Sequence, residues 1–299
     1  MGLLGRLKSF TLADPESEIA RIVPLAECSA DECSNCELKY PSSLRIDTDT
    51  PLWNNTPVWS LQILIATGKT DWIHSISEEP QSLAEALSEQ HRLLEEKAGG
   101  KVKINNCSAL PPDEHQVAHF SWQILLLPYF IYIPVTSPRS VVNDVLAAID
   151  GFKNKSLPWM SPSFKKETDL QLVSNKETKL VPCVHKGFVL LCSHRTRDKR
   201  CGITAPILKK AFDVRLRQED LYRDAHDDRP GGVEVLFVNH VGGHKFNANC
   251  MVYLKSGEAL WMARVQPGHV EPIVEKTILE GKVFPELMRQ AIKGESLPW

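Results

Sequence analysis

Residues 187–202 have the sequence GFVLLCSHRTRDKRCG, in which an unbroken apolar run leads into a basic segment with a cysteine at each end. The run Gly187–Leu191 is typical of a short strand that is buried on both faces. We expect a helix over Ala205–Phe212, begun near Pro206, and a second buried strand over Val233–Asn239. If a helix joins the two strands, they are parallel, and both of their C-terminal ends open at one edge of the sheet.

Four side chains that bind metals well are expected at this edge. Cys192 follows the first strand, and Cys201 comes after eight intervening residues of the same loop. His240 follows the second strand, and His244 comes after three more residues, Val-Gly-Gly. The paired glycines disfavour a helix there and let the backbone pass close to a ligand. The sequence therefore predicts that two cysteines and two histidines converge from two loops.

Other cysteines and histidines nearby fit this site less well. Cys183 precedes the first strand and Cys192 follows it, so at about 3.3 Å per residue the two lie roughly 25–30 Å apart. Cys250 opens a later strand, and we expect it to be a small buried apolar residue. His194 is close enough to Cys192 to be an alternative ligand.

The rest of the second half predicts a hairpin and two helices. Cys250–Leu254 and Ala259–Val265 are expected to be strands joined by a turn that contains glycine. Val270–Leu279 and Pro285–Ile292 are expected to be amphipathic helices. The order β-α-β-β-β-α is that of a thioredoxin-like α/β domain, which we assign to residues 181–299.

The first half alternates between strands and helices in a similar way. Strands are expected at Trp59–Ala66, at Lys101–Asn105 and within Trp122–Val135, and helices at Gln81–Ala98 and Ser140–Ile149. This pattern predicts an α/β domain over residues 51–150. An irregular segment, residues 1–50, precedes it, and a polar linker with two prolines, residues 151–180, follows it.

Composition limits the class of protein. The chain has 299 residues with 42% hydrophobic and 24% charged side chains, as expected of one or two globular domains. The net charge is −6 for residues 1–180 and +4 for residues 181–299, which gives no reason to expect a nucleic-acid partner. No secretory signal is visible, and the apolar run Ile124–Val135 is too short to span a bilayer. We expect a soluble protein of the cytoplasm, with the mitochondrial matrix as the alternative, and no membrane partner.

Two segments of the second half resemble the signature of a known family: Cys192-Ser-His-Arg-Thr-Arg-Asp-Lys-Arg-Cys201-Gly202 and His240-Val-Gly-Gly-His244-Lys-Phe. The family is the sucrase/ferredoxin-like family, whose members are thioredoxin-like ferredoxins with bis-histidinyl ligation. The resemblance extends through Trp261–Val265, and to Cys33–Asp47 and Thr67–Trp72 in the first half.

The resemblance implies one [2Fe–2S] cluster, with two cysteines on one iron and two histidines on the other. It therefore implies one-electron transfer by Cys192, Cys201, His240 and His244 as the cluster ligands. It also implies that the N-terminal domain is a degenerate thioredoxin-like module that binds or shields a partner. We find no carboxylate pair typical of a glycosidase and no substrate pocket, so we expect an electron carrier rather than an enzyme.

Histidine ligands have two chemical consequences. Exchanging two thiolates for neutral imidazoles removes two negative charges, so the reduction potential rises. Each imidazole also keeps a second nitrogen that can hold a proton, which couples electron transfer to pH. Four cations between the cysteines would further favour the reduced state and dock an acidic redox partner protein, unless they simply form a solvated basic loop. These cations are Arg195, Arg197, Lys199 and Arg200.

Two other functions use the same residue types. The four ligands also suit tetrahedral zinc, which would make the chain a zinc-stabilised binding module. A thiol oxidoreductase would need a reactive Cys-x-x-Cys at the start of a helix, and the only such pair, Cys33 and Cys36, lies outside the thioredoxin-like region. With Cys28, this pair has the C-x4-C-x2-C spacing of plant-type ferredoxins but no fourth cysteine nearby, so a second metal site there is an alternative.

The sequence ends in Leu297-Pro298-Trp299. This tripeptide is similar to the tail by which cytosolic iron–sulfur proteins are recognised by their assembly machinery, although Pro298 departs from the usual middle residue. The alternative is that the Trp299 indole folds back on the last helix.

Overall fold

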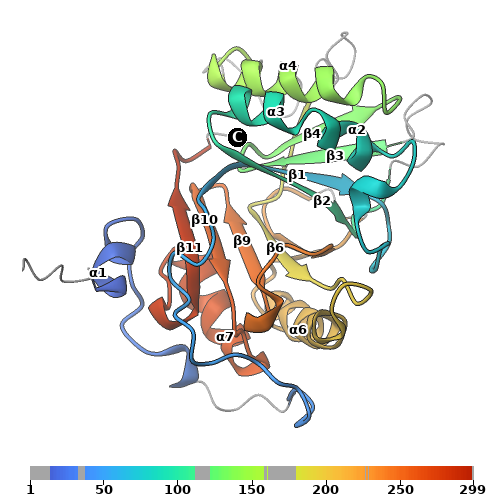
Figure 1. The fold of residues 1–299 in the computed structure, drawn as a ribbon. Coiled ribbons are helices and arrows are strands. Elements are labelled where there is room, and N and C mark those ends of the chain that lie inside the picture. The colour runs from blue at the N-terminus through green and yellow to red at the C-terminus, as the bar shows by residue number, and fades with distance from the viewer. Residues whose placement is uncertain are drawn as a thin grey trace, which may run out of the picture.

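The computed structural model describes residues 14–32, 38–111, 122–157, 160, 180–225, 227 and 229–297. Figure 1 shows helices on two opposite sides of the molecule, with the strands between them. Helices α2, α3 and α4 cover one side, and α6 and α7 cover the other. Among the described residues, no helix combines the length and the apolar character needed to cross a membrane.

The helices and strands of the first half are α1 (Pro15–Ala20), β1 (Trp59–Ala66), α2 (Leu83–Glu89), α3 (His91–Ala98), β2 (Lys101–Cys107), β3 (Trp122–Leu127), β4 (Ile131–Val135) and α4 (Val141–Lys153). Those of the second half are β5 (Val181–Pro182), β6 (Gly187–Cys192), α6 (Lys199–Gln218), β7 (Tyr222–Arg223), β8 (Val233–Val238), β9 (Cys250–Leu254), β10 (Glu258–Met262), α7 (Val270–Pro272) and β11 (Met288–Lys293).

All these strands belong to one sheet. Its order is β11-β10-β9-β6-β8-β2-β1-β3-β4-β5, and β7 pairs with β8 beside this path. The pair Cys107 and Val238 joins β2 of the first half to β8 of the second. The mixed α/β class is therefore confirmed. The domains predicted at residues 51–150 and 181–299 contribute strands to the same sheet, and their boundaries stay a prediction.

Side chains alternate between the two faces of each strand, so each half of the sheet packs one face against its own helices. Val189 and Leu191 of β6 lie in the core under α6 and α7, and Leu61 and Ile63 of β1 lie in the core under α2, α3 and α4. The opposite faces of both halves share a third core, which includes Trp59, Phe188, Tyr253 and Trp261. The sheet is thus folded so that its two helix-free faces pack on each other. Burying one such large apolar side chain contributes about 1.5–3 kcal/mol.

The N-terminal segment packs on the second half. Its described residues, 14–32 and 38–50, are largely irregular apart from α1 and a 3₁₀ turn at Ala30–Glu32. Ile19, Val23 and Ala30 nevertheless belong to the core under α6 and α7. The Tyr40 hydroxyl also donates a hydrogen bond to the carbonyl oxygen of Val265 at 2.8 Å. Residues of the predicted linker fall mostly outside the described residues.

Two predicted helices differ in extent from the observed ones. The helix expected over Gln81–Ala98 is divided at Gln90 into α2 and α3. The helix expected over Ala205–Phe212 is longer, because α6 begins at Lys199 and continues past Pro206. The Asp198 side chain caps α6 by accepting a hydrogen bond from the backbone N–H of Arg200, which stabilises the earlier start. Cys201 therefore lies on a helix and not in a loop.

The last two predicted helices need correction. Val270–Leu279 begins as the single turn α7 and continues as a π-helical segment, Ile273–Leu279. Pro285–Ile292 is not a helix: a 3₁₀ turn leads into strand β11. Strand β11 pairs antiparallel with β10, which satisfies its backbone hydrogen bonds and covers the edge of the sheet. This pairing outweighs the short helical periodicity of the segment.

Burial of Glu234 on β8 predicts a dependence of stability on pH. Burial raises the pKa of this carboxyl from 4.5 to about 7, and the nearest imidazole nitrogen, Nδ1 of His185, is 3.7 Å away. The folded state then holds a proton that the unfolded chain releases, so stability falls as pH rises from 4.5 to 7. Glu234→Gln should remove this fall and gain up to about 3 kcal/mol at pH 8.

Urea unfolding between pH 5 and pH 8 measures this effect. Glu89→Gln, at an exposed position of α2, serves as the control and should leave the pH profile unchanged. A Glu234→Gln profile parallel to that of the wild type would contradict the assignment.

Candidate metal centre

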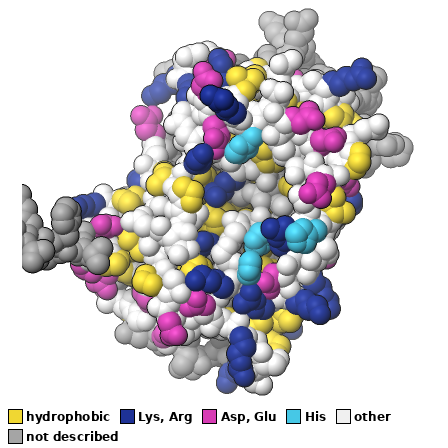
Figure 2. All heavy atoms as spheres, viewed as in Figure 1, with side chains coloured by type: hydrophobic (Ala, Val, Ile, Leu, Met, Phe, Trp, Pro, Cys, Tyr) yellow, Lys and Arg dark blue, Asp and Glu magenta, His cyan; other side chains and the backbone are white. Residues whose placement is uncertain are grey.

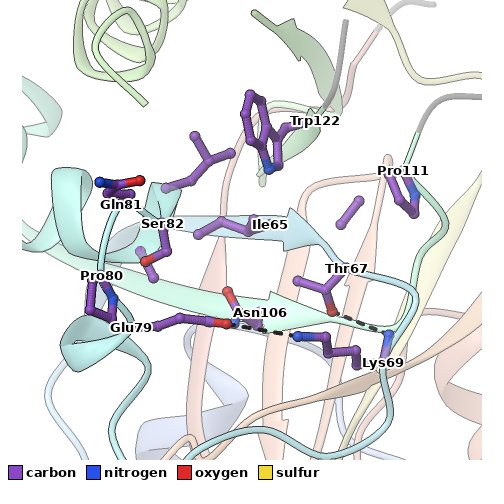
Figure 3. A pocket seen from close by; sticks show the side chains of 13 residues that line it. Ile65, Thr67, Lys69, Glu79, Pro80, Gln81, Ser82, Asn106, Pro111 and Trp122 are labelled. Carbon is purple, nitrogen blue, oxygen red and sulfur yellow. Dashed lines mark hydrogen bonds and ion pairs between the residues drawn. The ribbon is translucent and has the colours of Figure 1, made fainter. Parts of the chain in front are cut away.

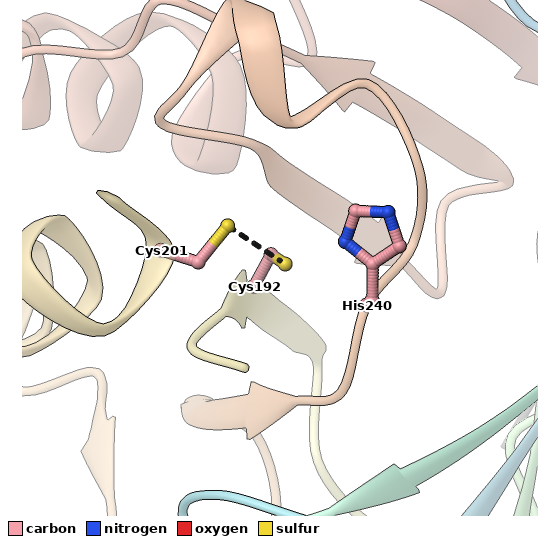
Figure 4. Close-up of side chains that lie close together, drawn as sticks. All are labelled: Cys192, Cys201 and His240. Carbon is pink, nitrogen blue, oxygen red and sulfur yellow. Dashed lines mark hydrogen bonds between the residues drawn. The ribbon is translucent and has the colours of Figure 1, made fainter. Parts of the chain in front are cut away.

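The parallel pair β6 and β8 brings Cys192 and His240 together. Cys192 is the last residue of β6 and pairs with Val238, the last residue of β8. His240 follows two residues later, so both residues lie at the same edge of the sheet, as predicted. Figure 4 shows their side chains pointing toward one another.

Helix α6 contributes Cys201 from its first turn. The sulfur atoms of Cys192 and Cys201 are 3.5 Å apart. The ligand atoms of Cys192, Cys201 and His240 all lie within 4.8 Å of one another, and they form a group that could hold a metal ion (Figure 4). Two tetrahedral thiolate ligands at about 2.3 Å from one metal would have sulfurs roughly 3.8 Å apart. The observed sulfur–sulfur distance fits such a pair.

The pKa values of the two thiols shift in opposite directions. The hydrogen bond between them lowers the pKa of Cys192 well below its ordinary value, and His240 and the backbone N–H of Val241 act in the same direction. The same hydrogen bond, together with burial, raises the pKa of Cys201. These opposite shifts favour the thiolate, the form that binds metals, at Cys192. Asn247 donates to the Cys201 sulfur at 3.1 Å and is itself held by Thr204.

The two histidines differ in exposure. Nδ1 of His240 is buried and has no hydrogen-bond partner. An unpaired buried nitrogen is costly unless something else, such as a metal, uses its lone pair. The side chain of His244 is 48% exposed, its ring centre is 5.2 Å from that of His240, and its Nε2 is 3.9 Å from Asp198. The structure thus brings three of the four predicted ligands into one group and places His244 at its rim.

His194 forms hydrogen bonds through both of its ring nitrogens. Its Nε2 bonds to the carbonyl oxygen of Trp72 at 3.0 Å, and its Nδ1 accepts from the backbone N–H of His240 at 3.1 Å. Both ring nitrogens are therefore used, which removes His194 as an alternative ligand. Cys183 precedes β6 and Cys250 lies on β9; both are buried in apolar cores, and neither belongs to the group of Cys192, Cys201 and His240.

The basic loop is only partly paired. Arg200 forms an ion pair with Asp198 at 2.8 Å; although burial opposes ionisation of this carboxyl, the hydrogen bonds from Arg200 lower its pKa. Arg195, Arg197 and Lys199 are exposed. Figure 2 shows histidines and basic side chains close together on this face of the molecule. These three cations can meet a partner at the rim of the site.

The first half also supports the site. Asp71 accepts hydrogen bonds from the backbone and hydroxyl of Thr196, and the carbonyl oxygen of Thr70 accepts from Ser193. Sequence reasoning noted the segment Thr67–Trp72 through the family resemblance but did not place it beside the metal-binding loop. It also missed Asn247, although the run Asn-Ala-Asn directly follows the histidine segment.

A separate cavity of about 310 Å³ lies where β1 and β2 end. Figure 3 shows the side chains that line it, among them Asn106 and the pair Lys69 and Glu79, which form a 3.8 Å ion pair. Its lining includes no cysteine or histidine. This cavity is therefore distinct from the candidate metal centre.

Two predictions fall outside the described residues. Cys28 is partly buried against the second-half core, but Cys33 and Cys36 are not described, so a second metal site there stays a prediction. The same is true of recognition by the iron–sulfur assembly machinery through Trp299.

Known proteins resemble most of the chain. The model of the sucrase/ferredoxin-like family matches residues 52–290. Actin patches distal protein 1 of Saccharomyces cerevisiae is 38% identical, over 85% of this chain and 81% of its own length. Altered inheritance of mitochondria protein 32 of Meyerozyma guilliermondii is 26% identical, over 88% of this chain and 92% of its own.

One solved structure matches part of the chain. It is a thioredoxin-like [2Fe–2S] ferredoxin from Aquifex aeolicus, with 14% identity and a TM-score of 0.27. The match spans 38% of this chain and 98% of the ferredoxin.

Proposed function

This chain belongs to the sucrase/ferredoxin-like family, and from that premise we propose that it carries one [2Fe–2S] cluster and transfers single electrons. The proposed ligands are Cys192 and Cys201 on one iron and His240 and His244 on the other. The observation that carries the proposal is the grouping of Cys192, Cys201 and His240 within 4.8 Å. The lowered pKa of Cys192 favours its thiolate, and Nδ1 of His240 is buried without a hydrogen-bond partner, so both atoms are placed as a metal would need them.

The surroundings of the four ligands suit an electron carrier. When bound, the cluster would supply a one-electron couple. Both cysteines are buried, so the protein would exclude water from the iron that they are proposed to hold. Asn247 donates to the Cys201 sulfur and would stabilise its charge. The side chain of His244 is half exposed, and Asp198 lies beside it.

Elemental and acid-labile sulfide analysis of anaerobically purified protein tests the proposal. About two irons and two sulfides per chain, together with a visible chromophore, are expected. One zinc per chain and no sulfide would favour a zinc-stabilised binding module instead, because three close soft ligands also suit a single tetrahedral ion.

The proposed partner is a redox protein with an acidic surface. Arg195, Arg197 and Lys199 are exposed beside the ligands, where they would steer such a partner toward His244. We propose the cytoplasm as the location. The mitochondrial matrix is the alternative, since the name of the Meyerozyma relative, altered inheritance of mitochondria protein 32, refers to mitochondria.

Charge reversal at the rim should slow electron exchange with anions. In the triple variant Arg195→Glu, Arg197→Glu and Lys199→Glu, oxidation of the reduced protein by ferricyanide at low ionic strength should slow by about tenfold or more. Stopped-flow absorbance measures the rate, and added salt should shrink the difference.

The matched control reverses three exposed cations of the first half: Arg92, Lys97 and Lys101. Lys101 starts β2, at the opposite end from the contact between Cys107 and β8. Equal slowing in both triple variants would contradict docking at the rim, since only net charge would then matter.

A further inference from the structure

Arg289 is placed by a β-bulge. In the pairing of β11 with β10, Met288 lies opposite Met262 and Gln290 lies opposite Trp261, so Arg289 is an extra residue without a partner. A bulge re-aims side chains and is common beside functional sites. The Arg289 side chain is directed inward, and the residue is only 3% exposed.

The Arg289 guanidinium holds the loop that joins the two histidines. Its Nη1 donates to the carbonyl oxygen of Gly242 at 3.1 Å and to Oδ1 of Asn249 at 2.8 Å. Nδ2 of Asn249 in turn donates to the carbonyl oxygen of Gly243 at 3.0 Å. Arg289 therefore fixes, directly and through Asn249, two of the three peptide carbonyls between His240 and His244, those of Gly242 and Gly243.

The loop passes directly over the guanidinium. A Cβ atom on Gly243 would lie 2.5 Å from three atoms of the Arg289 guanidinium, and the φ of Gly243 is +72°. Only glycine satisfies both the close approach and this backbone conformation. The need for Gly243 in the His-Val-Gly-Gly-His segment therefore arises in part from Arg289.

The charge of Arg289 is not balanced by a carboxylate. Within the described part of the chain it forms no ion pair, and its Nε is buried without a partner. Its neighbours are aromatic rings, with Trp261 at 4.5 Å and Phe246 at 5.4 Å. Lys103 lies 4.4 Å from the same Trp261 ring. Burial lowers the pKa of Arg289 to about 10.

We propose that Arg289 is a positioning residue of the metal centre, which fixes the His240–His244 loop and favours additional negative charge at the ligands. Only the second part of this proposal, the effect on charge at the ligands, rests on the proposed function. Reduction by one electron adds one negative charge to the centre. A buried cation without a counter-ion stabilises that charge more strongly than a solvated one would, so it raises the reduction potential.

Two substitutions separate position from charge. Arg289→Gln removes the charge and the paired donors, whereas Arg289→Lys keeps the charge but not the planar arrangement of donors. In dye-mediated titrations with dithionite, Arg289→Gln should lower the midpoint potential by about 59 mV, a tenfold change for a one-electron couple. Arg289→Lys should stay near the wild-type potential.

Hydrogen–deuterium exchange of the metal-free protein tests the positioning alone. In both variants the amides of Val241–His244 should exchange roughly tenfold faster than in the wild type, because hydrogen bonds to a charged donor are lost. This readout does not require a cluster, so it stands even if the protein binds zinc. If Arg289→Gln does not fold, exchange in Arg289→Lys still decides the positioning role.

Arg264→Gln is the matched control. Arg264 lies 5.5 Å from the same Phe246 ring, but Asp47 balances its charge and its donors reach the backbone of Asp47 and Thr50. In the Arg264→Gln variant, the midpoint potential and the exchange rates of the Val241–His244 amides should match those of the wild type. Wild-type exchange in both Arg289 variants would overturn the positioning role, and a wild-type potential in Arg289→Gln would overturn the charge role.

Discussion

Cys201→Ser is expected to abolish cluster binding. A serine hydroxyl does not ionise near neutral pH and is a harder ligand than a thiolate, so the iron beside Cys192 loses one of its two protein ligands. The variant also removes the partner that lowers the pKa of Cys192. Anaerobically purified Cys201→Ser should be colourless, with nearly all iron and sulfide lost, as measured by absorbance and elemental analysis.

Cys183→Ser is the matched control. Cys183 is as buried as Cys201 but lies before β6, whereas Cys192 ends that strand. The cluster should survive this substitution with its spectrum unchanged. Loss of the cluster in Cys183→Ser, or a full cluster in Cys201→Ser, would contradict the proposed ligand set.

His240→Cys and His244→Cys should each retain a cluster of lower potential. Each change adds a negative thiolate to the iron that the histidines hold, so adding an electron costs more. Clusters with two histidines lie at about −150 to +300 mV, against about −400 mV for plant-type ferredoxins, which suggests a fall of roughly 100 mV or more for one substitution. Protein-film voltammetry or a dye-mediated titration measures it.

His74→Cys controls for the added thiol. His74 is exposed and contacts Arg197 of the basic loop, but it is not among the proposed ligands. Its variant should keep the wild-type potential. If His244→Cys also keeps that potential, His244 is not a ligand, and the protein ligands are limited to Cys192, Cys201 and His240.

The edge of the sheet that carries the site could be predicted from the sequence. Two apolar runs, the second interrupted only by Glu234, with a helical segment between them permit few arrangements. The parallel pair β6 and β8 brings Cys192 and His240 to one edge as expected. The glycines of the histidine loop were also informative, because Gly242 and Gly243 both have positive φ. Patterns of this kind are predictable because they depend on residues that are close together in the sequence and on burial of the strands.

The parts that were missed depend on contacts between distant segments. Strand β11 has a helix-like pattern, and only pairing with β10 makes it a strand and produces the bulge at Arg289. The early start of α6 depends on the capping carboxylate of Asp198, so the helical position of Cys201 was not foreseen. His194 could be excluded as a ligand only when its partners, Trp72 and the backbone of His240, were known.

The measurement that tests the central claim most directly is electron paramagnetic resonance of the anaerobically purified protein after reduction with dithionite. A rhombic, Rieske-like signal with a low average g value is predicted, because one iron of the cluster would be held by two histidines. A colourless protein that contains one zinc per chain, and that shows no such signal after iron–sulfur reconstitution, would contradict the account.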